Sequence, residues 1–408
     1  MGPRLTRHVA ALFAALFAGC LYGAAPDPCG QDDASACISR ASVLLAAGKA
    51  TEGVALMEDA CKRMGEASAC GSAARALVSG DSARDGDAGP GEASPFGRAV
   101  SDWDAGCRLG DGQACWELGR LSMTGKGMPK DQAMARSRYD EGCKHGWAES
   151  CVDAGLIRER AKEDLPRALE LWKRACELGD GRGCAKVGLA AKYGTAGPVD
   201  LVAALKSYEE ACAKGYFGGC GFAAFVYEKG EGVPADSAKR LQMLLAGAKL
   251  RDPLAVELLT KGRAAGTFPD EQVKSVLDAV ATVSDTKCKG GDGNACLVAG
   301  LVAQDAALPA PQVASFYKGA CEHDAREGCG RLAKMIRAHQ VDASGFTRPA
   351  ELEAAGCMAH WAPACLDWGR TAESGVETEG PQKQAAASAY GAACQGGIQE
   401  ACEALKRF

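Results

Sequence analysis

Cysteine is the residue type whose spacing predicts chemistry most clearly in this chain of 408 residues, which contains 21 cysteines. Apart from Cys20, the cysteines fall into ten pairs, and nine of these have the spacing C-x7-C. An even set of regularly spaced cysteines is typical of a disulfide framework in an exported protein. Because the spacing repeats, pairing within each motif is favoured. The predicted disulfides are Cys29–Cys37, Cys61–Cys70, Cys107–Cys115, Cys143–Cys151, Cys176–Cys184, Cys212–Cys220, Cys288–Cys296, Cys321–Cys329, Cys357–Cys365 and Cys394–Cys402.

Metal binding is the competing chemistry for paired cysteines. A zinc site of the usual kind has ligands two to four residues apart in at least one half of the site. The sequence contains no C-x-x-C, C-x-x-C-H or H-E-x-x-H motif. We therefore expect no metal site and no cofactor.

Serine followed by lysine three residues later is a second pattern with catalytic potential, because S-x-x-K occurs in serine acylases such as β-lactamases and penicillin-binding proteins. The pattern occurs at Ser284 with Lys287 and at Ser315 with Lys318. No S-D-N, K-T-G or G-x-S-x-G motif accompanies either copy. A nucleophile without an oriented base and oxyanion donors is inert, so we expect no catalytic residue here.

The cysteine pairs recur at a regular distance along the chain. From Cys107 the first cysteines follow at intervals of 36, 33 and 36 residues, and from Cys288 at 33, 36 and 37. The gap of 76 residues between Cys212 and Cys288 equals two repeats, and we place the hinge without cysteines at Gly247 and Ala255. Periods of this length predict a solenoid of antiparallel helix pairs.

The residues around each cysteine pair predict how the helices meet. An aromatic residue one helical turn before the first cysteine shares its helix face and should lie in the core. These residues are Trp103, Tyr139, Trp172, Tyr208, Tyr317 and Tyr390. A glycine three residues after the first cysteine suits a left-handed helix cap. These glycines are Gly110, Gly146, Gly179, Gly215, Gly291 and Gly397. A small residue four positions after the second cysteine lets helices approach closely. These residues are Gly119, Gly155, Gly188, Ala224, Gly300 and Gly369.

Each disulfide is therefore expected to join the end of one helix to the start of the next. Closing a ring of this size stabilises the chain by about 2.5 kcal/mol per bridge. Ten such bridges would replace the bulky core that a chain with 6% aromatic residues lacks. We expect full reduction to collapse stability.

The loops at the end of the helix pair away from the cysteines have their clearest sequence pattern at 125–131 and 230–236, where glycines permit a turn. Asp131 and Asp236 then suit the N-cap of the next helix. With small-x-x-x-Leu-Gly before it, this pattern resembles the Sel-one-like repeat, a relative of the tetratricopeptide repeat. The C-x7-C version resembles the Helicobacter cysteine-rich protein family. The resemblance covers about residues 29–408, and is sharp at 103–131 and 208–236 and weak at 238–287 and after 330. It implies an all-α, right-handed superhelical solenoid with one disulfide per repeat.

The N-terminus resembles a bacterial export signal. Arg4 and Arg7 precede an apolar stretch at 9–18, which is too short to span a membrane. The stretch ends at Cys20 in a sequence similar to a lipobox, although Phe17 stands where leucine is usual. The resemblance implies lipidation of Cys20, while cleavage after Ala25 is the alternative.

The domain organisation follows from these boundaries. Residues 1–19 are predicted to be a lipoprotein signal peptide, 20–28 a short tether and 29–408 the solenoid, with a flexible insertion at 79–95. We expect the protein in the bacterial cell envelope, as an outer-membrane lipoprotein, a periplasmic protein or a secreted form.

Charge and repeat architecture narrow the function. The formal net charge is −5 and no basic cluster follows the N-terminus, which argues against nucleic-acid binding. We expect a scaffold that binds protein or peptide ligands on its concave face, of undetermined oligomeric state. The alternatives are a β-lactamase or penicillin-binding protein, implied by the family resemblance, and a peptidoglycan or glycan-binding module. We call the six aromatic residues that precede a first cysteine by one helical turn the ladder. A glycan-binding module would be expected to place the aromatic residues outside this ladder on one exposed face, and these residues are Trp116, Trp147, Phe217, Trp361 and Trp368.

Overall fold

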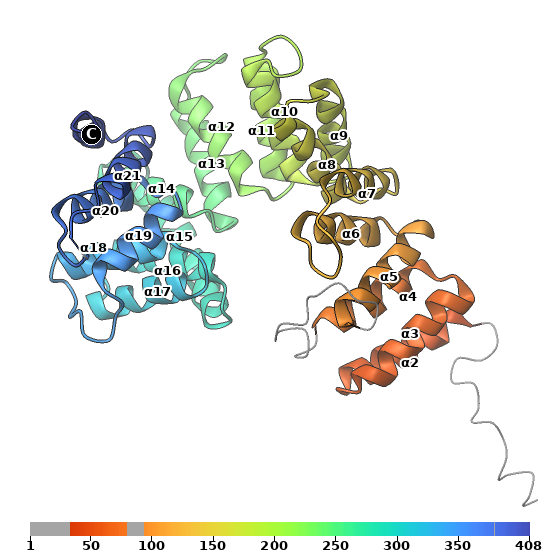
Figure 1. Ribbon diagram of the computed structural model, residues 1–408. Coiled ribbons are helices and arrows are strands. Elements are labelled where there is room, and N and C mark those ends of the chain that lie inside the picture. Colours follow the sequence, from red (N-terminus) through yellow and green to blue (C-terminus); the bar gives the residue numbers. More distant parts are fainter. Residues whose placement is uncertain (1–32, 80–93, 379) are drawn as a thin grey trace, which may run out of the picture. The chain divides into compact units, whose positions relative to one another are not determined.

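The structure is a computed structural model that describes residues 33–79, 94–378 and 380–408. The predicted signal peptide, Cys20, Cys29 and most of the insertion (80–93) lie outside these residues. Every regular element in the described ranges is a helix (Figure 1). The helices are α2 (Ala34–Ala46), α3 (Ala50–Met64), α4 (Ala67–Ser79), α5 (Pro95–Arg108), α6 (Gly112–Thr124), α7 (Gln132–Lys144), α8 (Ala148–Ala161), α9 (Leu165–Glu177), α10 (Gly181–Tyr193), α11 (Leu201–Ala213), α12 (Phe217–Lys229), α13 (Ser237–Lys249), α14 (Pro253–Ala264), α15 (Asp270–Lys289), α16 (Gly293–Asp305), α17 (Ala310–Glu322), α18 (Glu327–Arg337), α19 (Pro349–Met358), α20 (Ala362–Ser374), α21 (Lys383–Gln395) and α22 (Gln399–Leu405).

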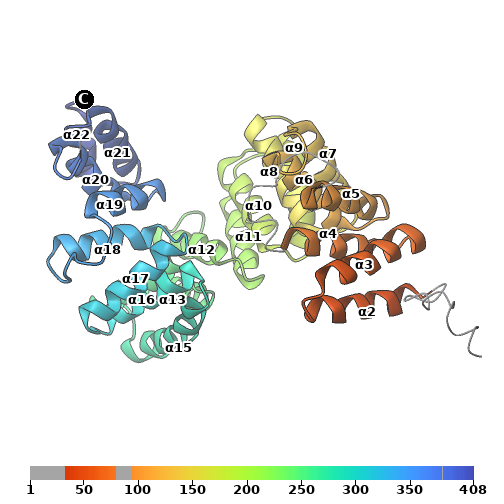
Figure 2. The same ribbon diagram turned by 60° about the horizontal axis from the view of Figure 1, so that its bottom comes forward.

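The chain divides into two compact units, residues 1–183 and 184–408, and the division falls inside α10. Within each unit, helices that follow one another in sequence pack side by side. Examples are α6 with α7 in the first unit and α16 with α17 in the second (Figures 1 and 2). The prediction of an all-α solenoid built from helix pairs is confirmed. No helix among the described residues is both long and apolar enough to cross a membrane.

Disulfides close the hinges between consecutive helices. The Cα atoms of the bonded cysteines lie 4.4 to 4.8 Å apart, within the usual range for a disulfide. The described bridges are Cys61–Cys70, Cys107–Cys115, Cys143–Cys151, Cys212–Cys220, Cys288–Cys296, Cys321–Cys329, Cys357–Cys365 and Cys394–Cys402. Cys37, Cys176 and Cys184 are disulfide-bonded as well. The arrangement of about one disulfide per repeat is thereby confirmed.

The backbone of the hinges follows the predicted conformation. All six glycines expected at left-handed caps have positive φ, between 81° at Gly215 and 99° at Gly179. The turns at the far end behave in the same way, since Asp131 and Asp236 each accept a backbone N–H bond of 2.9 Å from the first turn of the next helix.

Aromatic rings join one repeat to the next. A Cβ atom placed on Gly119 would lie 2.4 Å from the Tyr139 ring, and one on Gly155 would lie 2.2 Å from the indole nitrogen of Trp172. Each ring therefore rests on the backbone of the preceding repeat, where only glycine leaves room. The same contact recurs at Gly188 with Tyr208, Gly300 with Tyr317 and Gly369 with Tyr390. All six predicted ladder rings are buried, as expected.

The hinge without cysteines lies one residue further along than predicted. A Cβ on Gly247 would lie 3.0 Å from Ala255 Cβ, just as a Cβ on Gly106, the residue before Cys107, would lie 3.1 Å from Ala114 Cβ. Gly247 and Ala255 thus each precede a cysteine position. The prediction was wrong because a spacing of eight residues fits both registers, and only the helix contact distinguishes them.

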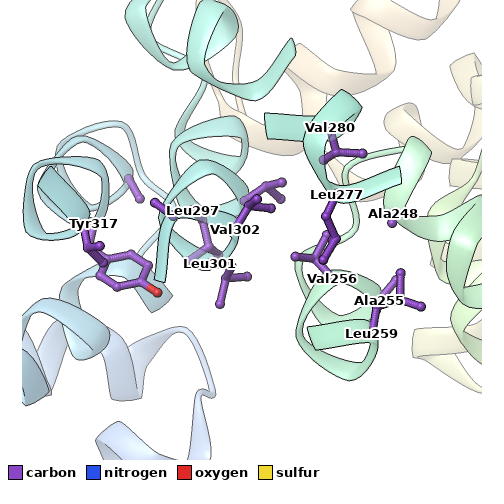
Figure 3. Close-up of a cluster of buried hydrophobic side chains, with 14 of the residues drawn as sticks. Ala248, Ala255, Val256, Leu259, Leu277, Val280, Leu297, Leu301, Val302 and Tyr317 are labelled. Atoms are coloured by element: carbon purple, nitrogen blue, oxygen red, sulfur yellow. The ribbon is translucent and has the colours of Figure 1, made fainter. Parts of the chain in front are cut away.

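The cysteine positions of this hinge are occupied by Ala248 and Val256, both fully buried. Arg251 takes the positive φ of 62° that a glycine supplies in other hinges. Ala248 and Val256 belong to the largest hydrophobic cluster of the described residues, which extends from α12 to α19. Figure 3 shows Val256 beside Leu277 in this cluster, with Leu259 below them.

Candidate functional site

The two S-x-x-K motifs do not form catalytic pairs. Ser284 is fully buried on α15 and its hydroxyl has no hydrogen-bond partner, whereas Lys287 is exposed. Ser315 is exposed and donates its hydroxyl proton to the Gln312 carbonyl oxygen at 2.7 Å. Lys318 lies 3.8 Å from the Glu322 carboxylate. Neither serine is hydrogen-bonded to its motif's lysine.

The aromatic residues off the ladder have separate structural roles. Trp116 donates an N–H bond of 2.7 Å to Asp153. Trp147 stands at the N-cap of α8 with its indole nitrogen buried and without a partner. Trp361 stacks beneath the Arg331 guanidinium at 4.9 Å, and Trp368 packs against the core of the C-terminal helix pairs. The remaining residue of this set, Phe217, lines a groove.

This groove lies in the second unit and has a volume of about 540 Å³. It is bounded by the last turns of α10, by α11 and α12, and by the start of α14. We call it the aromatic groove. The large side chains that wall it are Tyr193, Phe217, Phe222, Phe225 and Leu254. All five are between 38% and 68% exposed, so a row of apolar groups faces solvent in one place.

The sequence of α12 explains why a hollow forms. Gly218, Gly221, Phe222 and Phe225 recur at the i, i+3, i+4, i+7 spacing that places residues on one helix face. The two glycines leave empty space, and the two phenylalanines flank it. Cys220 lies on the buried face of the same helix and is disulfide-bonded to Cys212, which fixes α12 against α11.

An ammonium group already lies on the rings at the rim. The Lys192 ammonium forms an ion pair of 2.6 Å with Glu231 and lies 5.2 Å from the centre of the Phe225 ring. It also lies 5.9 Å from the Tyr193 ring. Cations within about 6 Å of an aromatic face are attracted by its negative charge density. The rim of the groove is therefore chemically suited to cations.

Tyr208 supplies a polar atom at the base of the groove. Its side chain is 1% exposed, its ring centre lies 5.0 Å from that of Phe222, and its hydroxyl has no hydrogen-bond partner. Burial raises the pKa of this phenol to about 12, so the hydroxyl stays protonated. A buried hydroxyl without a partner costs free energy.

Asp252 is the buried acidic group of the groove, whereas Glu231 at the rim is paired with Lys192. Asp252 is 5% exposed and stands at the N-cap of α14, where its Oδ1 accepts the Leu254 N–H at 3.1 Å. Burial raises the pKa of the carboxyl to about 6. Within the described ranges, no lysine, arginine or histidine forms an ion pair with it.

Comparison with known proteins supports the repeat assignment. The Sel1 repeat model matches residues 112–137, 151–180, 181–216 and 220–250. Among solved structures, a Sel1 repeat protein from Oxalobacter formigenes is 21% identical, with 59% of this chain and 95% of that chain covered at a TM-score of 0.47. The protective antigen c5321 of uropathogenic Escherichia coli, which displays an SLR fold, is 18% identical, with 86% and 81% covered at 0.46. Yeast Tom70 is 10% identical, with 89% and 91% covered at 0.36.

A search of curated protein sequences found no match. The fold and the recurring hinges define an α-helical repeat protein of the solenoid class. More particularly, four segments of the chain match the Sel1 repeat model, and the last two of them include most of the aromatic groove.

Proposed function

We propose that this protein is an exported, envelope-anchored scaffold that binds a partner protein through the aromatic groove. The observation that carries the proposal is the row of exposed aromatic side chains around one hollow, since contiguous apolar patches on soluble proteins mark interaction sites. Repeat solenoids commonly present extended binding surfaces of this kind.

The disulfides indicate an oxidising environment, extracellular or periplasmic. The finer location follows from the proposed lipid anchor at Cys20, which would hold the mature chain at the outer membrane of a bacterial envelope. A Cys20→Ser variant then tests the anchor, because it should be recovered in the soluble periplasmic fraction, whereas the parent protein stays with membranes.

Binding through the groove is tested by cross-linking in intact cells of the native host. The Phe222→Ala/Phe225→Ala variant should lose the cross-linked protein species that the parent forms. Both side chains are about 40% exposed, so their loss should change stability little. Phe408→Ala, at a ring of similar exposure away from the groove, should keep the same species. Unchanged cross-links in the groove variant would show that the groove is not the binding surface.

A further inference from the structure

The geometry points to a cationic side chain, an arginine or a lysine of the partner protein, as the group that the aromatic groove binds at Asp252. This inference rests on the proposed function and adds the chemistry of the ligand. Three features carry it: a buried carboxylate without a counter-ion, an equivalent hinge elsewhere in the chain in which the counter-ion is present, and rings placed to receive a cation.

The hinge at Asp180 shows what is missing at Asp252. Asp180 occupies the same position, four residues after the first cysteine position, and accepts the backbone N–H of Arg182 at 2.8 Å. The Arg182 guanidinium then folds back onto the carboxylate, with Nη2 at 2.6 Å from Oδ2. At Asp252 the residue two positions on is Leu254, which donates the equivalent backbone bond and brings no charge. The second oxygen of Asp252 therefore lacks the cation that Asp180 has.

A cation is compatible with this position although it lies at the start of a helix. Helix N-termini favour negative charge, which would oppose a cationic ligand. At the Asp180 hinge this repulsion does not prevent an ion pair, because Arg182 lies at the start of α10 and still pairs with the carboxylate. Asp252 neutralises the start of α14 in the same way, and a guanidinium can approach its outer oxygen.

The surroundings of Asp252 strengthen an ion pair there. Asp252 is 5% exposed, and Phe217, Phe222 and Leu254 line the same hollow, so the carboxylate lies in apolar surroundings that strengthen charge interactions. The aromatic faces of the hollow can stack on a planar guanidinium. A guanidinium can also present two N–H groups to one carboxylate, which an ammonium cannot do in the same geometry, so we expect arginine to bind more tightly than lysine.

The experiment uses a set of capped pentapeptides that differ only at the centre, where leucines flank an arginine, lysine, citrulline or glutamate. Titration calorimetry against the oxidised protein measures the dissociation constants. Citrulline keeps the shape of arginine and removes its charge. We expect the arginine peptide to bind at least about tenfold more tightly than the citrulline peptide, because only the charged side chain forms charge-assisted hydrogen bonds with the carboxylate.

Two variants locate the effect. Asp252→Asn keeps the cap oxygen and removes the charge, and should lower the affinity for the arginine peptide about tenfold without changing that for citrulline. Leu254→Arg copies the Asp180 hinge and should occupy Asp252 from within, abolishing the preference for arginine in a fully folded protein. The matched control is Asp292→Asn, which alters the N-cap of α16 outside the groove and should leave every affinity unchanged.

Equal binding of the arginine and citrulline peptides would overturn the cation site and leave groove binding itself intact. Failure of all four peptides to bind would also overturn it. In both cases the cross-linking of the Phe222→Ala/Phe225→Ala variant still decides the proposed function, so the two failures can be told apart.

Discussion

The hinge at Cys107 and Cys115 and the hinge at Ala248 and Val256 join their helices in the same geometry by different means. In the first, a disulfide spans Cα atoms 4.7 Å apart, within a core of mainly small residues and one large ring, Trp103. In the second, no covalent bond is present, and the paired positions are filled by buried aliphatic side chains. The repeat therefore does not require the disulfide for its shape.

The difference shows how bulk can replace a covalent bond. The cluster around Ala248 and Val256 is rich in leucine and valine and spans α12 to α19, whereas the other clusters each cover a few helices and contain many alanines. Where side chains are small, a local disulfide restricts the unfolded chain and makes up for little apolar burial. At the hinge of Ala248 and Val256 the burial of large side chains is sufficient, although the same cluster also contains the bridges Cys288–Cys296 and Cys321–Cys329.

The difference also bears on function. The first turn after the hinge without a disulfide supplies Asp252 and Leu254 to the aromatic groove. Such a hinge can adjust its backbone without breaking a covalent bond, which suits a place where a ligand must enter.

Removal of one disulfide should have the largest effect. In Cys107→Ala/Cys115→Ala the bridge and two buried sulfur atoms are lost, so the free energy of unfolding should fall by about 4 kcal/mol. Guanidinium denaturation of the oxidised protein measures this. A loss below about 1 kcal/mol would mean that the bridge does not stabilise its hinge.

Truncation in the aliphatic cluster should cost slightly less. Leu259 is fully buried on α14, and Leu259→Ala should lower the free energy of unfolding by about 3 kcal/mol through lost burial and the cavity left behind. Leu254→Ala, on the same helix and 57% exposed, is the control and should change stability by less than about 0.5 kcal/mol. Equal effects of the two changes would contradict the role of the cluster.

A cysteine pair introduced at the hinge without cysteines should form a disulfide like those of the other hinges. Ala248→Cys/Val256→Cys should oxidise spontaneously and raise the free energy of unfolding by about 2.5 kcal/mol. Gly247→Cys/Ala255→Cys is the control for register. Its Cβ atoms would lie about 3.0 Å apart, below the range of about 3.5–4.5 Å for a disulfide, so it should destabilise the protein. If Gly247→Cys/Ala255→Cys were the more stable of the two variants, Gly247 and Ala255 would occupy the cysteine positions, as first predicted from the sequence.

The charge of Asp252 should produce the smallest effect, visible as a pH dependence. The pKa of this carboxyl is raised by burial to about 6 from an ordinary 3.8, so the folded state binds more protons than the unfolded state between these values. The free energy of unfolding should therefore fall as pH rises from 4 to 7, by about 2 kcal/mol.

Asp252→Asn should remove that share of the pH dependence. Burial also raises the pKa of Asp102 to about 6, and its contribution has the same sign, so the difference between parent and variant isolates Asp252. A constant difference across this range would contradict the buried, ionised carboxylate.

Local and covalent features were predictable from the sequence. The cysteine spacing, the hinge glycines and the aromatic residues such as Trp172 act within one repeat, and repetition makes each observation reinforce the others. The register at Gly247 failed because spacing cannot distinguish adjacent small residues. The aromatic groove was missed because Phe222 and Phe225 fit a core helix as well as a surface.

Of the residues that line the groove, only Phe217 stood out as a candidate, and the tryptophans grouped with it proved to be structural. One available signal was the alternation of Gly218 and Gly221 with phenylalanines on the face of α12 opposite Cys220. The burial of Asp252 depends both on Gly247 across its own hinge and on Gly221 of the preceding helix pair, and the second contact is not visible in the local sequence.

Hydrogen exchange of the oxidised and fully reduced protein, resolved along the chain by mass spectrometry, shows whether aliphatic burial replaces the disulfide at Ala248 and Val256. Reduction should remove protection from the hinges of α3 to α8, where small residues depend on disulfides. The helices α13 to α15 should retain most of their protection, because the aliphatic cluster holds them. Uniform loss of protection along the whole chain, or none anywhere, would contradict the idea that burial replaces the disulfide at Ala248 and Val256.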